Sequence, residues 1–211
     1  FVLDGKRAKL GGDGLGLCML VEMEKAQPGS VDMELMVGMA KHIERMMLPS
    51  GELLSFYDWD GKGVTNRKSI FYSGEAILGL LRVYQLTGDE HWLDVAEQAS
   101  DYLVERRWVS MGIRLYVPLD AWLIQALEEL DRVRPNDKRA WYAFELSEAI
   151  ARRKMMDPSV TPPDMLGAGV SGIRSLPHAA TAGAFGEALS AAARLEARRN
   201  PGETRHRTFA M

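Results

Sequence analysis

Residues 71–89 read FYSGEAILGLLRVYQLTGD, and this stretch decides the fold. From Gly74 to Leu86, apolar residues fall on nearly every face of a helix, and Thr87-Gly88-Asp89 ends it. A helix that is apolar on all sides has to be surrounded by other parts of the protein. The stretch therefore predicts an inner helix that the rest of the chain wraps.

Other segments with helical periodicity alternate between this apolar type and an amphipathic type with one charged face. The apolar segments are 15–25, 120–132 and 179–199, and the amphipathic segments are 31–47, 90–107 and 139–156. Inner helices that alternate with surface helices are typical of antiparallel helical hairpins arranged around a ring. We therefore predict an all-α domain over residues 1–199 that forms a partial or incomplete (α/α) toroid, with a flexible tail over 200–211.

The helix at 31–47 is rich in methionine, and Ser30 and Glu34 frame its start as a cap would. The face that we expect it to bury carries Leu35, Met39 and Ile43. Residues 53–70 differ in kind, because aromatic residues flank an Asp/Gly turn there. That pattern predicts a short β-hairpin or an ordered loop inserted near 53–70.

Composition excludes several classes of protein. The chain of 211 residues has a formal net charge of −3 and no basic stripe, so we expect no nucleic-acid partner. No run approaches the roughly 20 apolar residues of a membrane span, and the start shows no signal-peptide pattern. We therefore expect no membrane association and favour the cytoplasm, although the compartment itself is not encoded here. The single cysteine, Cys18, excludes an internal disulfide.

Motifs for metals and cofactors are also missing. The four histidines lie in separate contexts, and Asp58-Trp59-Asp60-Gly61 lacks the third acidic position of a calcium loop. The glycine-dense run at 11–16 follows no convincing strand, so we interpret it as a loop that leads into a helix and not as a dinucleotide site. We expect neither a metal nor a cofactor.

The run Tyr72-Ser73-Gly74-Glu75-Ala76, followed by Leu86-Thr87-Gly88-Asp89, resembles the six-hairpin glycosidase-like α/α toroids. Within that superfamily it is closest to the C-terminal domain of D-glucuronyl C5-epimerases. Leu10 to Leu15, Asp120-Ala121-Trp122 and the run from His178 to Ala182 look like the starts of equivalent hairpins. The resemblance covers most of residues 10–199. It implies an active cleft at the mouth of the ring, where the inner helices begin.

Glycan chemistry needs carboxylates as acid and base and flat aromatic side chains to stack on sugar faces. At the implied mouth, we expect Glu75 and Asp120 to act as acid and base, and Tyr72 and His178 to transfer protons or orient the substrate. The expected substrate-binding residues are Asp58, Trp59, Asp60, Trp122, Arg174 and Thr181. The chain is then a carbohydrate-active or carbohydrate-binding domain, with a glycan or small sugar as ligand and hydrolysis or epimerisation of an acidic polysaccharide as the implied reaction.

Two alternatives stay open at this level. Asp120 is also explained as a helix cap, and Glu75 as a favourable charge in the first turn of a helix. Neither explanation requires a catalytic role. The whole chain is alternatively a non-catalytic helical scaffold that binds a protein partner or a second copy of itself, with the methionine-rich helix at 33–47 as its contact surface. Whether the chain is an enzyme at all is therefore left open by its sequence.

Overall fold

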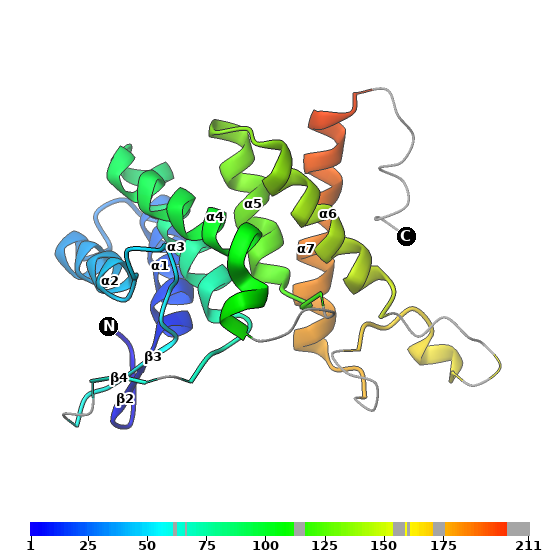
Figure 1. Cartoon of the computed structure of the whole chain (residues 1–211), viewed down its shortest axis with the longest axis horizontal. Helices are drawn as coiled ribbons and strands as arrows, with labels where there is room; N and C mark the ends of the chain where they lie inside the picture. The colour runs from blue at the N-terminus through cyan, green and yellow to red at the C-terminus, as the bar shows by residue number, and fades with distance from the viewer. Residues whose placement is uncertain are drawn as a thin grey trace. The chain divides into compact units, whose positions relative to one another are not determined.

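The computed structural model describes residues 1–60, 63–65, 67–111, 117–153, 159, 161–170 and 176–201. In this part of the chain it forms seven α-helices, one 3₁₀ helix and four short strands (Figure 1). These elements fall into two compact units, Phe1–Leu115 and Tyr116–Met211.

The first unit contains two helical hairpins and a sheet. Its helices are α1 (Leu10–Ala26), α2 (Met33–Arg45), α3 (Tyr72–Thr87) and α4 (Glu90–Met111). Consecutive helices pack on each other, and α1 also packs along α3. Every residue from Ser73 to Leu81 is buried, as an inner helix requires. Gly88 adopts φ 71° just past α3, where the left-handed conformation that closes a helix favours glycine.

Glycines let α1 and α3 approach until their backbones touch. A Cβ atom on Gly14 would overlap the carbonyl group of Glu75, and one on Gly79 would lie 2.6 Å from the Gly14 carbonyl oxygen. Gly11 faces Tyr72 and Glu75, so the two helices run in the same direction and begin at the same end of the unit. The glycine-dense run that we interpreted as a loop is therefore the first two turns of α1, where it forms a helix-packing surface.

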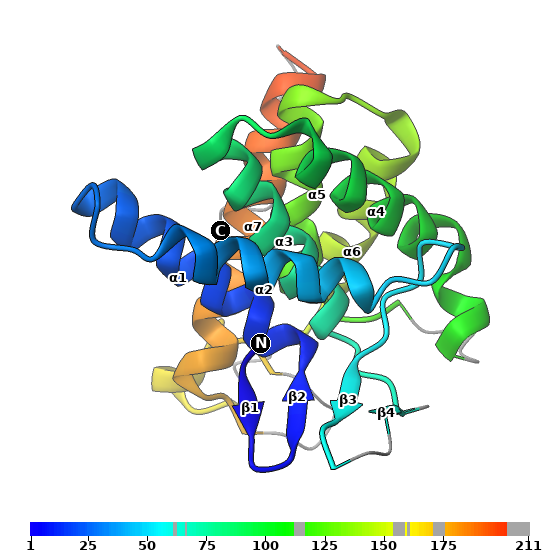
Figure 2. The same ribbon diagram turned by 90° about the vertical axis from the view of Figure 1, so that its left-hand side faces the viewer.

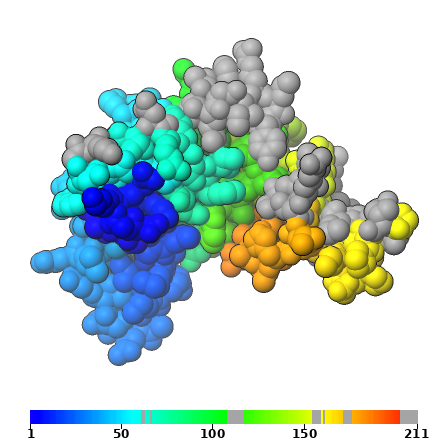
Figure 3. All heavy atoms as spheres, turned by 90° about the horizontal axis from the view of Figure 1, so that it is seen from below, coloured from blue at the N-terminus to red at the C-terminus, as the bar shows by residue number. Residues whose placement is uncertain are grey.

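The first unit also contains a sheet of four antiparallel strands in the order β1-β2-β3-β4 (Figure 2). They are β1 (Leu3–Asp4), β2 (Arg7–Lys9), β3 (Phe56–Asp58) and β4 (Gly63–Val64). Ala8 pairs with Leu3 on one side and with Tyr57 on the other. Figure 3 shows the N-terminal hairpin, in dark blue, beside the cyan segment that carries β3 and β4. The predicted β-hairpin near 53–70 is confirmed, whereas β1 and β2 were not predicted.

The second unit is built around α5. Its elements are α5 (Ala121–Val133), α6 (Asp137–Ala151), the 3₁₀ helix η1 (Pro163–Met165) and α7 (Ala179–Arg199). Both α6 and α7 pack on α5. Side-chain contacts join Gln125 to Glu187 and Glu128 to Arg198, so α5 and α7 also run in the same direction. Their first turns therefore lie at one end of the unit.

The predicted fold class, antiparallel helical hairpins of a partial (α/α) toroid with a short β insertion, is confirmed. The segments at 74–86 and 120–132 are both buried inner helices. Most of the predicted tail lies outside the described residues, because 202–211 are not described. Within the described chain, no helix combines the length and the hydropathy of a bilayer-spanning segment.

Three details differ from expectation. The α2 cap is Asp32, which accepts the backbone N–H groups of Glu34 and Leu35, and not Ser30. On the same helix Met39 and Ile43 are buried as predicted, whereas Leu35 is exposed and Met36 is buried. Finally, α1 is not wrapped on all sides. An exposed apolar strip on α1 consists of Leu15, Met19 and Met23.

Candidate functional site

Tyr72 and Glu75 lie together in the first turn of α3, where the glycines of α1 make room for them. A Cβ atom on Gly11 would overlap the Glu75 carboxylate and would lie 2.5 Å from Cδ1 of Tyr72. Glu75 is only 7 % exposed, and the Tyr72 ring meets the Phe56 ring edge-on with 5.2 Å between centroids. The structure thus places the predicted residues Tyr72 and Glu75 side by side at the start of α3.

A second buried carboxylate, Asp13, lies in the first turn of α1 and holds three parts of the unit together. Its Oδ1 accepts the backbone N–H of Val2 at 2.6 Å, and its Oδ2 lies 2.7 Å from Nδ1 of His42 on α2. The His42 ring lies beside Phe1, with 4.8 Å between ring centroids, and meets Tyr57 edge-on at 6.5 Å. Sequence spacing could not reveal this Asp–His pair, because its members are 29 residues apart on different helices.

The hairpin residues that were predicted to bind substrate lie partly in the sheet and partly in solvent. Asp58 Oδ1 accepts a hydrogen bond from Nε of Arg7 at 2.6 Å, and this bond and the negative charge of Asp58 raise the pKa of the Arg7 guanidinium. Trp59 is 60 % exposed and lies beside Phe1, with 5.2 Å between ring centroids. Asp60 is exposed as well. Trp59 is thus accessible as a flat stacking surface, whereas Asp58 is part of the sheet.

In the second unit, the predicted residues lie at the starts of α5 and α7. Asp120 is fully buried and accepts the backbone N–H of Leu123 at 3.0 Å, which makes it the N-cap of α5. Trp122 follows it in the first turn and is half-buried. His178 is the N-cap of α7 and accepts the N–H of Thr181 at 3.3 Å, while the Thr181 hydroxyl lies 2.8 Å from Nε2 of His178.

The structure therefore places the predicted residues in two groups. Tyr72, Glu75 and the hairpin residues belong to the first unit, and Asp120, Trp122, His178 and Thr181 belong to the second. In both groups the residues lie where parallel inner helices begin, apart from the hairpin. Arg174 lies outside the described residues. Among the residues that the structure describes, no three His, Cys, Asp or Glu side chains gather as a metal site would require.

Comparison with known proteins finds similar solved structures, among them the following two. The crystal structure of a D-mannose isomerase superposes with a TM-score of 0.67 at 14 % identity, over 97 % of this chain and 57 % of the other. The Lin0763 protein from Listeria innocua gives a TM-score of 0.65, also at 14 % identity, over 91 % of this chain and 57 % of the other. No family model and no curated protein sequence matches the chain. The chain thus shares the helical fold of both proteins and spans a little over half of their length.

Proposed function

We propose that this chain is a carbohydrate-active domain that transfers protons on a sugar, as an isomerase or epimerase does. The observation that carries the proposal is the first turn of α3, where Glu75 is held almost fully buried beside Tyr72 against the glycines of α1. A carboxylate sheltered from water and a neighbouring phenol are suitable groups for general acid–base catalysis. The D-mannose isomerase with the same fold supports a sugar as the substrate.

Glu75, Tyr72 and Trp59 have separate roles in the proposed reaction. Glu75 takes the proton from the carbon next to the open-chain carbonyl, and the Tyr72 hydroxyl hydrogen-bonds to the sugar oxygen where negative charge develops. Isomerisation returns the carbon-bound proton to the former carbonyl carbon, while Tyr72 gives its hydroxyl proton to the former carbonyl oxygen and takes the proton of the hydroxyl on the deprotonated carbon. Epimerisation instead places a proton on the opposite face of the deprotonated carbon. Trp59 offers the exposed face on which a sugar ring stacks.

Replacing Glu75 by glutamine tests this assignment, because the amide keeps the shape of the side chain but cannot accept the proton. We expect Glu75→Gln to lower the rate of solvent-deuterium incorporation into D-mannose or D-glucuronate at least about 100-fold. The matched control is Glu90→Gln, which changes an acidic residue in the first turn of another helix of the same unit. Equal rates in a folded Glu75→Gln variant and the unchanged chain would remove Glu75 from the mechanism.

One observation favours the alternative of a non-catalytic scaffold. Leu15, Met19 and Met23 are spaced four residues apart and exposed on one face of α1, which is a typical pattern for a helix that receives another helix. The methionine-rich helix that was predicted to be the contact surface buries Met36 and Met39 and exposes Met33 and Leu35. A chain that dimerises through Met19 and neither binds nor exchanges protons on any sugar would support the scaffold.

A further inference from the structure

Basic side chains gather toward the ends of α5 and α7 in the second unit. These two helices pack side by side and run in the same direction (Figure 1). Around these ends, residues 128–139 and 194–199 hold seven arginines and lysines against five acidic residues. Three of the arginines, which we call the arginine cluster, meet at the fully buried carboxylate of Glu128. They are Arg132, Arg194 and Arg198.

Glu128 holds the members of the arginine cluster in different ways. Arg132 donates to both carboxylate oxygens, from Nε and Nη2, at 2.9 Å each, and Arg198 donates to Oε1 from Nη1 at 2.5 Å. Arg194 Nη2 lies 3.7 Å from Oε2, which is too far for a hydrogen bond. Within the described ranges, Glu128 is the one carboxylate that forms an ion pair with Arg194. Charge attraction therefore holds Arg194 in the cluster, and its N–H groups are available to another acceptor.

The carboxylates within reach do not balance these charges. An arginine keeps its charge at any ordinary pH. Asp131 pairs with Arg199 of α7, and Arg198 Nη2 lies 3.9 Å from the same carboxylate. Arg199 also pairs with the exposed Asp137. With Glu128, three carboxylates therefore face four guanidinium groups, and like charges this close repel each other. An added anion would relieve that repulsion.

Solvent reaches every member of the arginine cluster. In chain order, the three side chains are 47 %, 52 % and 35 % exposed, whereas Glu128 beneath them is not exposed at all. An anion can therefore approach the guanidinium groups at the surface without entering a cavity. Guanidinium groups that a buried acid gathers from two helices present several N–H donors to one place, which is what an oxyanion requires.

The favourable position of a cation at the end of a helix does not explain the whole cluster. That effect is confined to the last turn, where it accounts for Arg198 and Arg199. Arg194 lies more than one turn before α7 ends at Arg199. Its place beside an acid that already accepts from two other arginines therefore needs a separate explanation.

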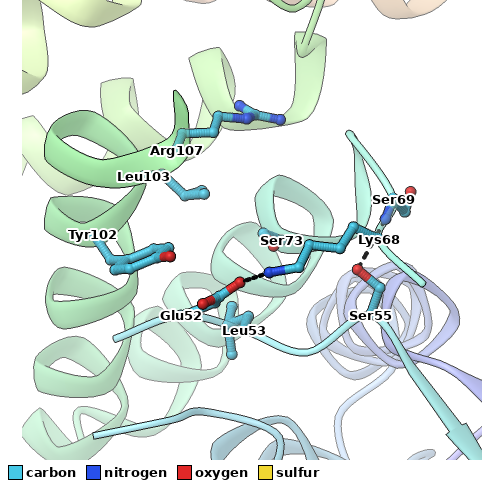
Figure 4. A pocket seen from close by; sticks show the side chains of 9 residues that line it. All are labelled: Glu52, Leu53, Ser55, Lys68, Ser69, Ser73, Tyr102, Leu103 and Arg107. Carbon is cyan, nitrogen blue, oxygen red and sulfur yellow. Dashed lines mark hydrogen bonds and ion pairs between the residues drawn. The ribbon is translucent and has the colours of Figure 1, made fainter. Parts of the chain in front are cut away.

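Two other ion pairs of the chain show the contrast. Lys68 pairs with Glu52 where they line a small hollow of the first unit, and Figure 4 shows the two side chains meeting. On α6, Arg152 pairs with Glu148 at 2.7 Å. In both pairs one cation meets one carboxylate, whereas three cations meet at Glu128.

We propose that the arginine cluster binds the oxyanion of a ligand, either a phosphoryl group or a carboxylate. Arg194 donates to the ligand, and the N–H groups of Arg132 and Arg198 that do not bond to Glu128 donate to its remaining oxygens. Glu128 is a positioning residue, because it gathers the guanidinium groups without touching the ligand. The binding is independent of the proton transfer proposed above, because it requires no reaction and uses no residue of the first unit.

Arg194 allows a test that leaves the hydrogen bonds of Glu128 intact, since it makes none of them. In calorimetric titrations of the whole chain at low ionic strength with inorganic phosphate and with acetate, we expect Arg194→Gln to weaken binding about tenfold. The matched control is Arg152→Gln, which removes an exposed arginine from the pair on α6 and should leave both affinities unchanged. Tighter binding of phosphate indicates a phosphoryl ligand, and tighter binding of acetate indicates a carboxylate.

Thermal unfolding separates ligand binding from a purely structural role. In chloride buffer we expect Arg194→Gln to melt about 1–2 °C above the unmodified chain, because Arg194 and Arg198 are like charges four residues apart on one helix. Phosphate should raise the Tm of the unmodified chain and of Arg152→Gln more than that of Arg194→Gln. The proposal is overturned if neither anion binds saturably, or if Arg194→Gln and Arg152→Gln lower the affinity equally. It is also overturned if Arg194→Gln melts lower in chloride and binds phosphate as the unmodified chain does.

Discussion

The Gly14→Ala variant is expected to lose about 3 kcal/mol of unfolding free energy, in the upper part of the range for overpacked cores. A single methyl group has this effect because there is no space for it. A Cβ atom on Gly14 would overlap the carbonyl group of Glu75 and would lie 2.6 Å from the backbone nitrogen of Ala76. These neighbours are backbone atoms inside a helix, so they cannot move aside as a flexible side chain would. The axes of α1 and α3 would have to separate, and both helices would lose buried contact.

Glycines elsewhere in the chain provide the control for helix propensity. Gly38 in α2 and Gly183 in α7 have no atoms within 4 Å of an added Cβ. Gly38→Ala and Gly183→Ala should therefore stabilise the chain by roughly 0.5–1 kcal/mol, because alanine favours a helix over glycine. Urea denaturation of the three variants measures the contrast. A Gly14→Ala chain as stable as the control variants would show that α1 and α3 do not touch as described.

The Glu128→Ala variant should also be strongly destabilised, by about 3 kcal/mol, because it removes the buried centre of an ion-pair network. Glu128 lies on α5 with its side chain fully buried, and its oxygens lie 2.9 Å from Nε and Nη2 of Arg132. Arg198 of α7 reaches the same carboxylate at 2.5 Å and also donates to the Glu128 carbonyl oxygen at 3.0 Å. Arginines from two helices therefore depend on one buried acid.

The same network extends about one turn along α5, from Glu128 to Asp131. Arg199 donates to Asp131 from Nε at 3.1 Å, and this hydrogen bond raises the pKa of the guanidinium. We place the Glu128→Ala effect at the lower end for buried pairs because Arg132 and Arg198 are partly exposed and can be hydrated after the change.

An ion pair on the neighbouring α6 is the matched control for this variant. Arg152 Nη2 lies 2.7 Å from Glu148 Oε2 at the same spacing of four residues as Glu128 and Arg132, but both side chains are more than half exposed. Glu148→Ala should cost less than about 0.5 kcal/mol. Urea denaturation, read by circular dichroism, compares the two. Similar small losses in both variants would show that Glu128 does not join α5 to α7.

The sequence could reveal the inner helices because their signal is local. The stretch at 74–86 is apolar on nearly every face, and in the structure residues 74–81 are buried on every face. The hairpin formed by β3 and β4 could be predicted for the same reason, because aromatic residues beside a Gly/Asp turn are typical of strands. By contrast, β1 and β2 are too short for a clear alternation, and only the Asp4-Gly5 pair, with Gly5 at φ 63°, signals their turn.

Other features of the structure could not be predicted, because they depend on contacts between segments that are far apart in the sequence. Glycine disfavours a helix in isolation, so the run at 11–16 was interpreted as a loop. In the structure the run is helical and packs against α3. The pairing of Asp13 with His42 and the meeting of Glu52, Lys68 and Arg107 at one hollow arise only when separate elements fold together. The places of Glu75 and Asp120 in their first turns could be predicted, but their chemical roles could not, because a cap and a catalytic acid look alike in sequence.

The most direct test of the proposed proton transfer is incubation of the unmodified chain with D-mannose and with D-glucuronate in deuterated water, followed by nuclear magnetic resonance of each sugar. Proton removal by a protein base leaves a deuterium at the carbon next to the carbonyl, or at the neighbouring carbon of an isomerised product, whichever product forms. We expect incorporation that requires the folded chain and that fails in Glu75→Gln. Sugars that stay free of deuterium beyond the rate without protein would contradict the proposed function.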